Sequence, residues 1–297
     1  MRGVPIVTIA AGGLCVCIFL ALALVRGEMS WEILAQVGYL PAPRIWDGAY
    51  WSLVSSAFVH IAAWHLLFNV YWLWTLGSVM ERVVGSVKYL SFILVAAAVT
   101  SAAQVGVSGA SGHGASGFVY AIFGFMWASR SAVPEFAAVV TEQTATLFWM
   151  WLVGCIVATW LDVVQVGNAA HVSGVLLGAA AAQYFIVRAW RRGPAMAATL
   201  AIVVSSFVSL FWSPWSAAWV AHAAYKAHVA GDYDAAIASY RRSMRLGFDR
   251  DWALKNLVYA YHSKHADKEL AATLEELRVH NPREAATLES ELQRGSQ

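Results

Sequence analysis

The chain has 297 residues, of which 59% are hydrophobic and 13% are charged, and its formal net charge at pH 7 is +2. This composition excludes an ordinary soluble globular protein and is typical of a membrane protein. The small, dispersed charge argues against nucleic acid as a partner. Residues 1–214 hold 16 of the Asp, Glu, Lys and Arg side chains, whereas the last 83 residues hold 22. The sequence therefore predicts a membrane part followed by a polar tail.

Seven apolar runs reach or approach the roughly 20 residues that a helix needs to cross a bilayer. They lie near residues 4–25, 57–80, 88–106, 117–129, 144–161, 169–187 and 194–213. The first run resembles a signal peptide but is long enough to span, so we expect it to be retained. With the N-terminus in the cytoplasm, most basic residues between the runs fall on the cytoplasmic side, as the positive-inside rule requires. Seven spans then place the tail outside the cytoplasm.

The connection at residues 26–56 is rich in Trp and Tyr, whose rings prefer the headgroup level of a bilayer. We expect it to lie along the membrane surface. The fourth run is too short to cross, because about 14 helical residues rise only about 21 Å. It follows a glycine-rich stretch at 106–115, whose unpaired backbone can exist at that depth only beside a watery cavity. The sequence thus predicts a wet pocket inside the membrane.

Two polar residues open neighbouring apolar runs, Ser116 on the fourth and His171 on the sixth. Alone, a serine in a membrane helix usually bonds to its own backbone. Small side chains at spacings of three or four give both runs a smooth face that permits close helix approach. These are Gly117, Ala121 and Gly124 on the fourth run, and Gly174, Gly178 and Ala182 on the sixth. Close approach would let the imidazole take the hydroxyl proton during nucleophilic attack.

The second run carries His65 and Asn69, which share one helical face at a spacing of four residues. Polar groups there are costly without partners. One interpretation is an oxyanion hole, completed by the backbone N–H of Ser116. The alternative is plain hydrogen bonding between helices.

The pattern over roughly residues 45–190 resembles the rhomboid family of intramembrane serine proteases. The resemblance rests on His60, His65 and Asn69, on Gly77, Glu81 and Gly85, on Gly114, Ser116, Gly117, Tyr120 and Gly124, and on Ala170, His171, Gly174 and Gly178. It implies that Ser116 is the nucleophile and His171 the general base. It also implies that His65 and Asn69 assist the oxyanion, and that Tyr120 stacks on His171 where other serine proteases use a carboxylate.

Several residues invite competing interpretations. Ser111 lies in a second Gly-Ala-Ser-Gly, but only Ser116 is followed by a tyrosine and a glycine at the right offsets and opens an apolar run. His113 is expected to line the cavity, and Glu81 to make a structural hydrogen bond near the cytoplasmic end. A zinc site at His60 and His65 is not expected, because no HExxH pattern is present. The cysteines lie within apolar runs, so neither a disulfide nor a cofactor or metal site is predicted.

One position departs from the family pattern. Many rhomboids carry a Trp-Arg pair in the first loop, and the corresponding pair here is Trp51 and Ser52. Loop anchoring or lipid contact could therefore differ, and Arg44 is a candidate replacement for the missing arginine.

The tail resembles tetratricopeptide repeats. Residues 217–250 and 251–284 align with a 34-residue period, and the segment from Gly231 to Ile237 fits the mid-repeat turn and second helix of that family. His265 replaces the turn glycine in the second repeat. A terminal helix near 283–293 is expected to cap the stack. The tail could be a plain helical stalk or a groove that binds a substrate, an adaptor or another copy.

Together these features predict an all-α polytopic membrane protein with a six-span rhomboid core at 1–192, a seventh helix at 193–215 and extracytoplasmic repeats at 216–297. The expected activity is cleavage of transmembrane proteins near the extracytoplasmic face, in a bacterial plasma membrane. The alternative is a catalytically inactive rhomboid-like scaffold that binds clients. The physiological substrate, the tail's partner and the oligomeric state are not encoded in any recognisable motif.

Overall fold

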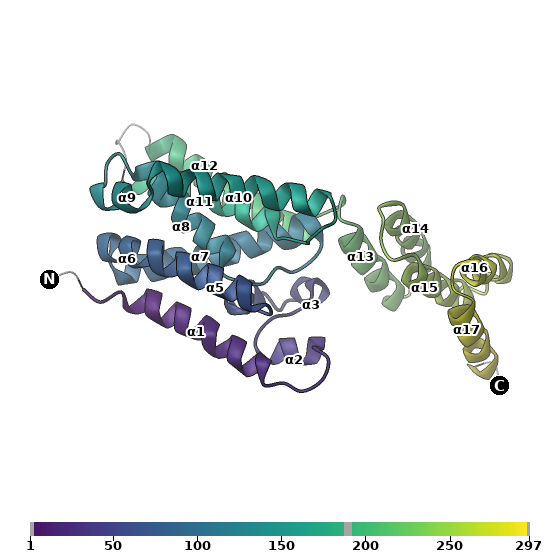
Figure 1. Ribbon diagram of the computed structural model, residues 1–297. Coiled ribbons are helices and arrows are strands. Elements are labelled where there is room, and N and C mark those ends of the chain that lie inside the picture. The colour runs from purple at the N-terminus through teal and green to yellow at the C-terminus, as the bar shows by residue number, and fades with distance from the viewer. Residues whose placement is uncertain (1–2, 187–191, 296–297) are drawn as a thin grey trace. The chain divides into compact units, whose positions relative to one another are not determined.

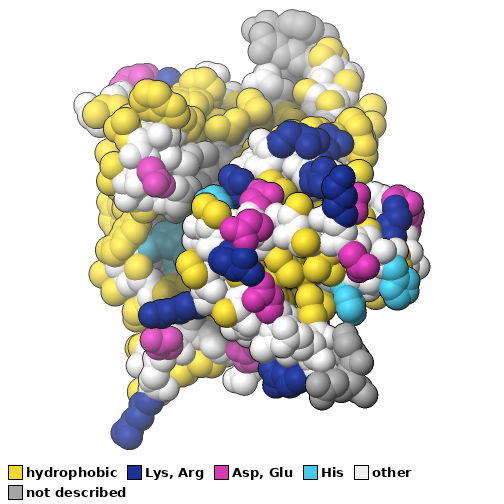
Figure 2. Space-filling model, turned by 90° about the vertical axis from the view of Figure 1, so that its right-hand side faces the viewer, with side chains coloured by type: hydrophobic (Ala, Val, Ile, Leu, Met, Phe, Trp, Pro, Cys, Tyr) yellow, Lys and Arg dark blue, Asp and Glu magenta, His cyan; other side chains and the backbone are white. Residues whose placement is uncertain are grey.

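The computed structural model describes residues 3–186 and 192–295, and every regular element within them is a helix (Figure 1). The chain divides into two compact units, Met1–Trp212 and Ser213–Gln297. We call them the membrane unit and the tail. On the face drawn in Figure 2, charged side chains of both signs gather in one region and apolar side chains cover much of the rest.

Four helices of the described residues are long and apolar enough to cross a membrane. They are α1 (Ile6–Ala23), α7 (Ser86–Ser108), α10 (Glu142–Trp160) and α12 (Arg192–Phe211). A fifth span results if a bent pair of helices, Ser52–Phe58 and Ala63–Val84, counts as one. The two further predicted runs form α8 (Ser116–Ser129), which is short and apolar, and α11 (Asn168–Phe185). These helices make the chain an integral membrane protein, while the count of seven spans stays a prediction.

The apolar run at 57–80 does not form a single straight helix. The chain bends by 98° between Ser52–Phe58 and Ala63–Val84. The longer arm consists of α5 (Ala63–Trp72), a π-helical turn at Leu73–Gly77 and α6 (Ser78–Val84). The bend lies at residues 59–62 and so includes His60, whose ring reaches the glycine-rich loop described below. The apolar sequence conceals this corner because the residues on both sides of it are hydrophobic.

The glycine-rich stretch is also shorter than expected. Helix α7 continues through Gly106 to Ser108 and ends at Gly109, which adopts the left-handed conformation with φ 71°. A Cβ atom at Gly106 would lie 2.2 Å from Oγ of Ser209, so this glycine serves the packing of α7 on α12 rather than a loop. The irregular segment before α8 therefore covers residues 109–115, which we call the glycine loop.

Three short helices occupy the connection between α1 and the bend: α2 (Trp31–Gln36), α3 (Ala42–Trp46) and α4 (Ser52–Ser55). Ser52 is fully buried, donates a hydrogen bond to the carbonyl of Gly38 and accepts one from the N–H of Leu40. Gly38 has φ 88°, so Ser52 closes a turn that needs a glycine. Arg44 is exposed. The buried serine, rather than Arg44, anchors this connection.

Helices α8 and α11 approach each other closely, backbone against backbone. A Cβ atom at Gly178 would lie 1.9 Å from the carbonyl oxygen of Ala121, and one at Gly174 would lie 2.4 Å from that of Gly117. On the other helix, a Cβ atom at Gly124 would lie 2.3 Å from the carbonyl oxygen of Val175. Only glycine allows this backbone separation, so the smooth faces expected from the sequence do meet.

The tail consists of two helical hairpins and a terminal helix. The first hairpin is α13 (Ala217–Val229) with α14 (Tyr233–Arg245), and the second is α15 (Arg250–Ser263) with α16 (Asp267–His280). Helix α17 covers Pro282–Gly295. Buried apolar residues of all five helices form one core.

The turns of the two hairpins correspond across the 34-residue period. Gly231 has φ 81° in the first turn, and His265, exactly one period later in the sequence, has φ 56° in the second. A non-glycine residue rarely adopts the left-handed region, so this shared conformation is imposed by the repeated turn.

Candidate active site

Ser116 and His171 face each other across the α8–α11 contact. The Oγ atom of Ser116 lies 2.8 Å from Nε2 of His171, within hydrogen-bond distance. His171 is 4% exposed, and its Nδ1 atom is buried without a hydrogen-bond partner among the described residues. No carboxylate therefore orients the imidazole. Nε2 can accept the hydroxyl proton when the ring is in the Nδ1–H tautomer.

The ring of Tyr120 supports His171 from one side. Their ring centroids are 4.6 Å apart with an interplanar angle of 30°, and Tyr120 donates a hydrogen bond of 3.4 Å to the carbonyl of Phe148. Tyr120 lies one turn after Ser116 on α8, so one helix presents both the hydroxyl and the ring that holds the imidazole. This contact restricts the imidazole to the orientation that faces Ser116.

The glycine loop is fixed by three hydrogen bonds from the segment before α5. Tyr39 Oη donates to the carbonyl of Ser111 at 3.1 Å, and the N–H of Gly114 donates to the carbonyl of Ser56 at 3.1 Å. The N–H of Ala115 donates to Nε2 of His60 at 3.3 Å. Each bond reaches more than 50 residues along the sequence. The position of Ser116, which follows the loop directly, therefore depends on the first connection and the bend.

His60 acts within this loop support. Its Nδ1 lies 3.3 Å from the carbonyl of Phe58 and its Nε2 accepts from Ala115. This pair of contacts requires the neutral Nδ1–H tautomer, because a carbonyl can only accept and an amide N–H can only donate. The expected supporting role of His60 is thus a specific one: it binds the backbone next to Ser116.

His65 and Asn69 lie on α5, and His65 borders the glycine loop. Gly114 adopts φ 96°, and a Cβ atom there would lie 2.4 Å from Cε1 of His65, so the loop passes directly over that ring. Asn69 is 2% exposed and donates one hydrogen bond of 2.9 Å to the carbonyl of His65. The amide has a second N–H and thus retains a donor. His65 therefore contacts the loop that precedes Ser116, and the side chain of Asn69 is bound to the backbone of His65.

His113, which was expected to line the site, lies next to His65. His113 contacts both His65 and Tyr39 edge to face, with ring centroids 5.6 and 5.2 Å away. Although three histidines lie close together here, no group of three His, Cys, Asp or Glu within the described residues has a geometry that could hold a metal ion.

Glu81 makes none of these contacts and instead anchors α1. Its carboxylate accepts hydrogen bonds from Val7 N, Thr8 N and Thr8 Oγ1 at 2.7 to 2.9 Å and from Ser86 Oγ at 2.7 Å. It therefore joins the start of α1 to the end of α6.

Two residues that the sequence interpretation passed over also contact the site. Gln104 Oε1 accepts a hydrogen bond of 3.3 Å from the N–H of Ala170, next to His171. Thr100 lies one turn earlier on α7, and a Cβ atom at Gly117 would lie 2.5 Å from its Oγ1. A glutamine in a membrane span is a signal in itself, since such groups are costly without partners.

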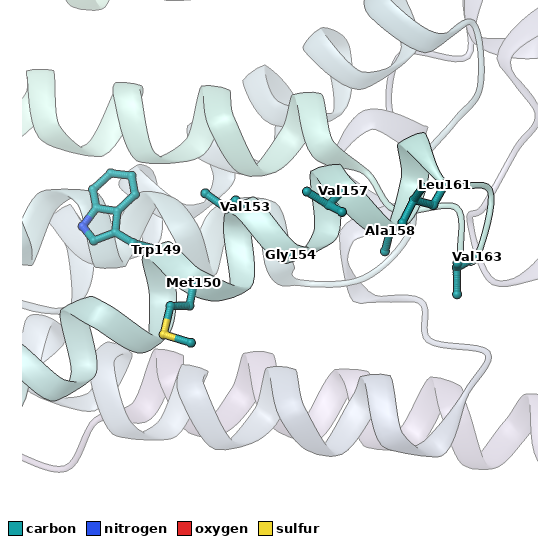
Figure 3. Close-up of a pocket in the computed structure, with 8 residues that line it drawn as sticks. All are labelled: Trp149, Met150, Val153, Gly154, Val157, Ala158, Leu161 and Val163. Carbon is teal, nitrogen blue, oxygen red and sulfur yellow. The ribbon is translucent and has the colours of Figure 1, made fainter.

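A separate apolar hollow of about 640 Å³ lies along α10 (Figure 3). All of its lining residues fall between Trp149 and Val163, and they alternate with the buried positions of α10 such as Phe148 and Leu152. The hollow thus faces outward and does not include Ser116 or His171.

Comparison with known proteins identifies the family. Residues 47–188 match the model of the Rhomboid domain. A 174-residue stretch is 36% identical to the rhomboid protease GlpG of Haemophilus influenzae and covers 58% of this chain and 86% of that protein. The chain therefore belongs to the rhomboid family.

Longer relatives are matched over a smaller share of their length. The chain is 34% identical over 176 residues to the rhomboid protease GlpG of Yersinia pseudotuberculosis and to that of Yersinia pestis. The match spans 58% of this chain and 59% of each of those proteins. The Rhomboid domain match at residues 47–188 lies within the membrane unit and contains both Ser116 and His171.

Proposed function

We propose that this chain is an intramembrane serine endopeptidase that uses Ser116 as nucleophile and His171 as general base. The observation that carries the proposal is the 2.8 Å separation of Ser116 Oγ and His171 Nε2, on two helices whose glycines allow that approach. Family membership adds to it, since the relatives that match are named rhomboid proteases.

The proposed reaction begins with proton transfer. His171 Nε2 takes the proton of Ser116 as Oγ attacks the carbonyl carbon of the scissile peptide bond. The resulting imidazolium then gives this proton to the leaving amine nitrogen when the tetrahedral intermediate collapses to the acyl-enzyme. Water attacks the ester by the same route, with His171 first accepting and then returning a proton to Ser116 Oγ. Tyr120 keeps the ring in place throughout.

The oxyanion needs donors aimed at the position where negative charge develops. We assign this role to His65, to the second amide N–H of Asn69 and to the backbone N–H of Ser116 at the start of α8. The N–H of Ala115 is already bonded to His60 at 3.3 Å, which supports assigning the loop donors to Ser116 rather than to its neighbour.

The substrate class we propose is a transmembrane protein cut near the extracytoplasmic face of a bacterial plasma membrane. A short α8 whose start lies below the surface, preceded by the glycine loop, would give water and an unwound peptide access from that side. The distribution of basic residues supports a cytoplasmic N-terminus and an extracytoplasmic tail. We further propose that the tail is a pair of tetratricopeptide-like repeats that contacts a protein partner or the substrate.

A cleavage assay on a model membrane-spanning substrate in proteoliposomes tests the assignment. Ser116→Ala is expected to abolish cutting, by at least about 10³-fold, because no other group supplies the attacking oxygen. Ser111→Ala is the matched control, since the observed contact of Ser111 uses its backbone carbonyl and survives the change. Retained cutting by Ser116→Ala would overturn the assignment. An inactive wild type across several substrates would favour the scaffold alternative.

A further inference from the structure

The end of α14 carries exposed basic side chains at the base of the tail. Arg242 and Arg245 are exposed, and so is Leu246 directly after them. Arg242 donates a hydrogen bond of 2.8 Å to the carbonyl of Pro214, which holds this end of α14 beside the first residues of the tail. Trp215, the next residue, is 49% exposed. We call these five residues the basal face.

The basal face is tied to the membrane by a short piece of chain. Helix α12 has the length and hydropathy of a membrane span and ends at Phe211, and the tail begins at Ser213. Two residues lie between Phe211 and Pro214, so three Cα–Cα steps put their Cα atoms at most about 11 Å apart. The first residues of the tail therefore stay near the end of α12 whatever the orientation of the tail, and Arg242 is bound to one of them.

The second hairpin provides an internal comparison. Equivalent positions one period apart agree in the interior, where Tyr240 and Leu274 are both buried and Ser243 and Leu277 are both buried. On the outside, Arg241, Arg242 and Arg245 of α14 correspond to Glu275, Glu276 and Val279 of α16. The basic charge is therefore not a requirement of the hairpin fold. It is particular to the hairpin that is joined to the membrane span.

The charge of the basal face is not neutralised within the tail. The sequence between Ala235 and Phe248 contains no Asp or Glu. Within the residues that the structure describes, Arg245 forms no ion pair, whereas Arg250 pairs with Glu276 at 2.6 Å. A guanidinium group binds phosphate by paired N–H donors, and exposed Trp and Leu side chains next to it suit the boundary between headgroups and acyl chains.

We propose that the basal face binds the headgroups of anionic phospholipids in the leaflet at which α12 ends. This contact holds the tail in one orientation on the membrane surface. The inference depends on the membrane span and the tail alone, and it stands or falls independently of the proteolytic activity.

The test uses the full-length protein in lipid nanodiscs, with a fluorophore on a single cysteine. The native cysteines Cys15, Cys17 and Cys155 are replaced by Ala. The probe is placed at Leu246→Cys, and at the equivalent exposed position of the second hairpin, His280→Cys, as the matched control. Quenching by a lipid with a nitroxide headgroup is compared between discs of phosphatidylcholine and discs with about 30% phosphatidylglycerol.

We expect stronger quenching at position 246 than at 280, and an increase at 246 alone when phosphatidylglycerol is present. Arg245→Gln is expected to lower the ratio of docked to undocked tail about fivefold. Lys268→Gln, an exposed change at the start of α16, should leave it unaltered. Thermal melting of the tail in phosphatidylcholine discs shows whether each variant folds. Equal quenching at both positions would overturn the proposal. So would quenching at 246 that changes neither with phosphatidylglycerol nor with Arg245→Gln.

Discussion

The membrane unit and the tail are both all-helical, but they bring their helices together by different means. In the membrane unit, α8 and α11 touch backbone to backbone, at Gly174 and Gly178. In the tail, larger side chains such as Tyr240 and Leu257 fill the space between helices, and ion pairs lie around the edge. In lipid, apolar side chains gain no hydrophobic free energy when helices associate, so close van der Waals packing has to stabilise the helix contact instead. In the tail, which we expect to be surrounded by water, the hydrophobic effect stabilises the contacts between helices.

The largest effect is expected from enlarging Gly178. Gly178→Val places a side chain where even Cβ would lie 1.9 Å from the carbonyl oxygen of Ala121, so α8 and α11 must separate. We expect a loss of about 3 kcal/mol in the free energy of unfolding of the membrane unit. We also expect loss of proteolysis, because Ser116 and His171 lie across this contact. Unfolding in mixed micelles and the cleavage assay measure the two effects.

Gly154→Val is the matched control. It makes the same change on α10, where a Cβ atom would have no heavy atom within 4 Å. It is expected to alter neither stability nor cutting. Similar damage from both variants would mean that the added valine side chain itself is harmful in this unit, whether or not two helices approach closely there.

The next effect is expected from a cavity in the tail. Leu254→Ala removes a fully buried side chain from α15 and should lower the stability of the tail by about 2 to 3 kcal/mol. Cutting of a model substrate by the membrane unit should be unchanged. Hydrogen exchange, which reports each unit separately, measures the local loss. If the membrane unit were destabilised equally, the two units would unfold as one.

A smaller effect is expected from the ion pairs around the tail. Lys255 Nζ lies 2.7 Å from Glu284 Oε1, with both side chains about one-third exposed. Lys255→Met should cost no more than about 1 kcal/mol, and less at high salt, because exposed pairs are screened. Thermal melting at low and high ionic strength checks this. A larger, salt-independent loss would contradict the interpretation of this contact as a screened surface ion pair.

The smallest effect is a pH dependence at His228. Burial lowers the pKa of this side chain, which lies 3.2 Å from Tyr240 Oη. The unfolded chain therefore binds a proton more readily than the folded tail does. The stabilisation is fully present above the ordinary histidine pKa of about 6.5 and is lost as the pH falls through the lowered value. The melting temperature of the tail should drop more between about pH 7.5 and about pH 5 in the wild type than in His228→Gln.

The positions of most helices could be predicted because the signals are local. Apolar length located α1, α7, α10 and α12 to within a few residues, and the 34-residue period located the hairpins of the tail. The corner at residues 59–62 could not be predicted, because hydrophobic residues continue through it. Ser52 could be noted only as a departure from a family pattern, since a buried serine that closes a turn has no sequence signature.

The candidate site shows the same division. Side chains with unusual cost in a membrane, such as His171 and Asn69, could be selected from the sequence. The hydrogen bonds that fix the glycine loop could not, because their partners are backbone groups such as the carbonyl of Ser56 and the N–H of Gly114. Backbone groups are the same in every residue and leave no pattern. Gln104, which also binds a backbone group, was passed over, although a glutamine in an apolar run is costly without a partner and could have been selected on that ground.

The unpartnered Nδ1 of His171 has a consequence for the cost of holding such a site in a bilayer. Moving a carboxylate-sized ion into a medium of low dielectric constant costs several kcal/mol even after relaxation, and it must then be offset by other contacts. A hydroxyl, an imidazole and a phenol ring impose no such permanent charge. With the proposed chemistry, charge separation exists only while a substrate occupies the cavity, so the resting protein inserts and folds as an electrically neutral assembly at this point.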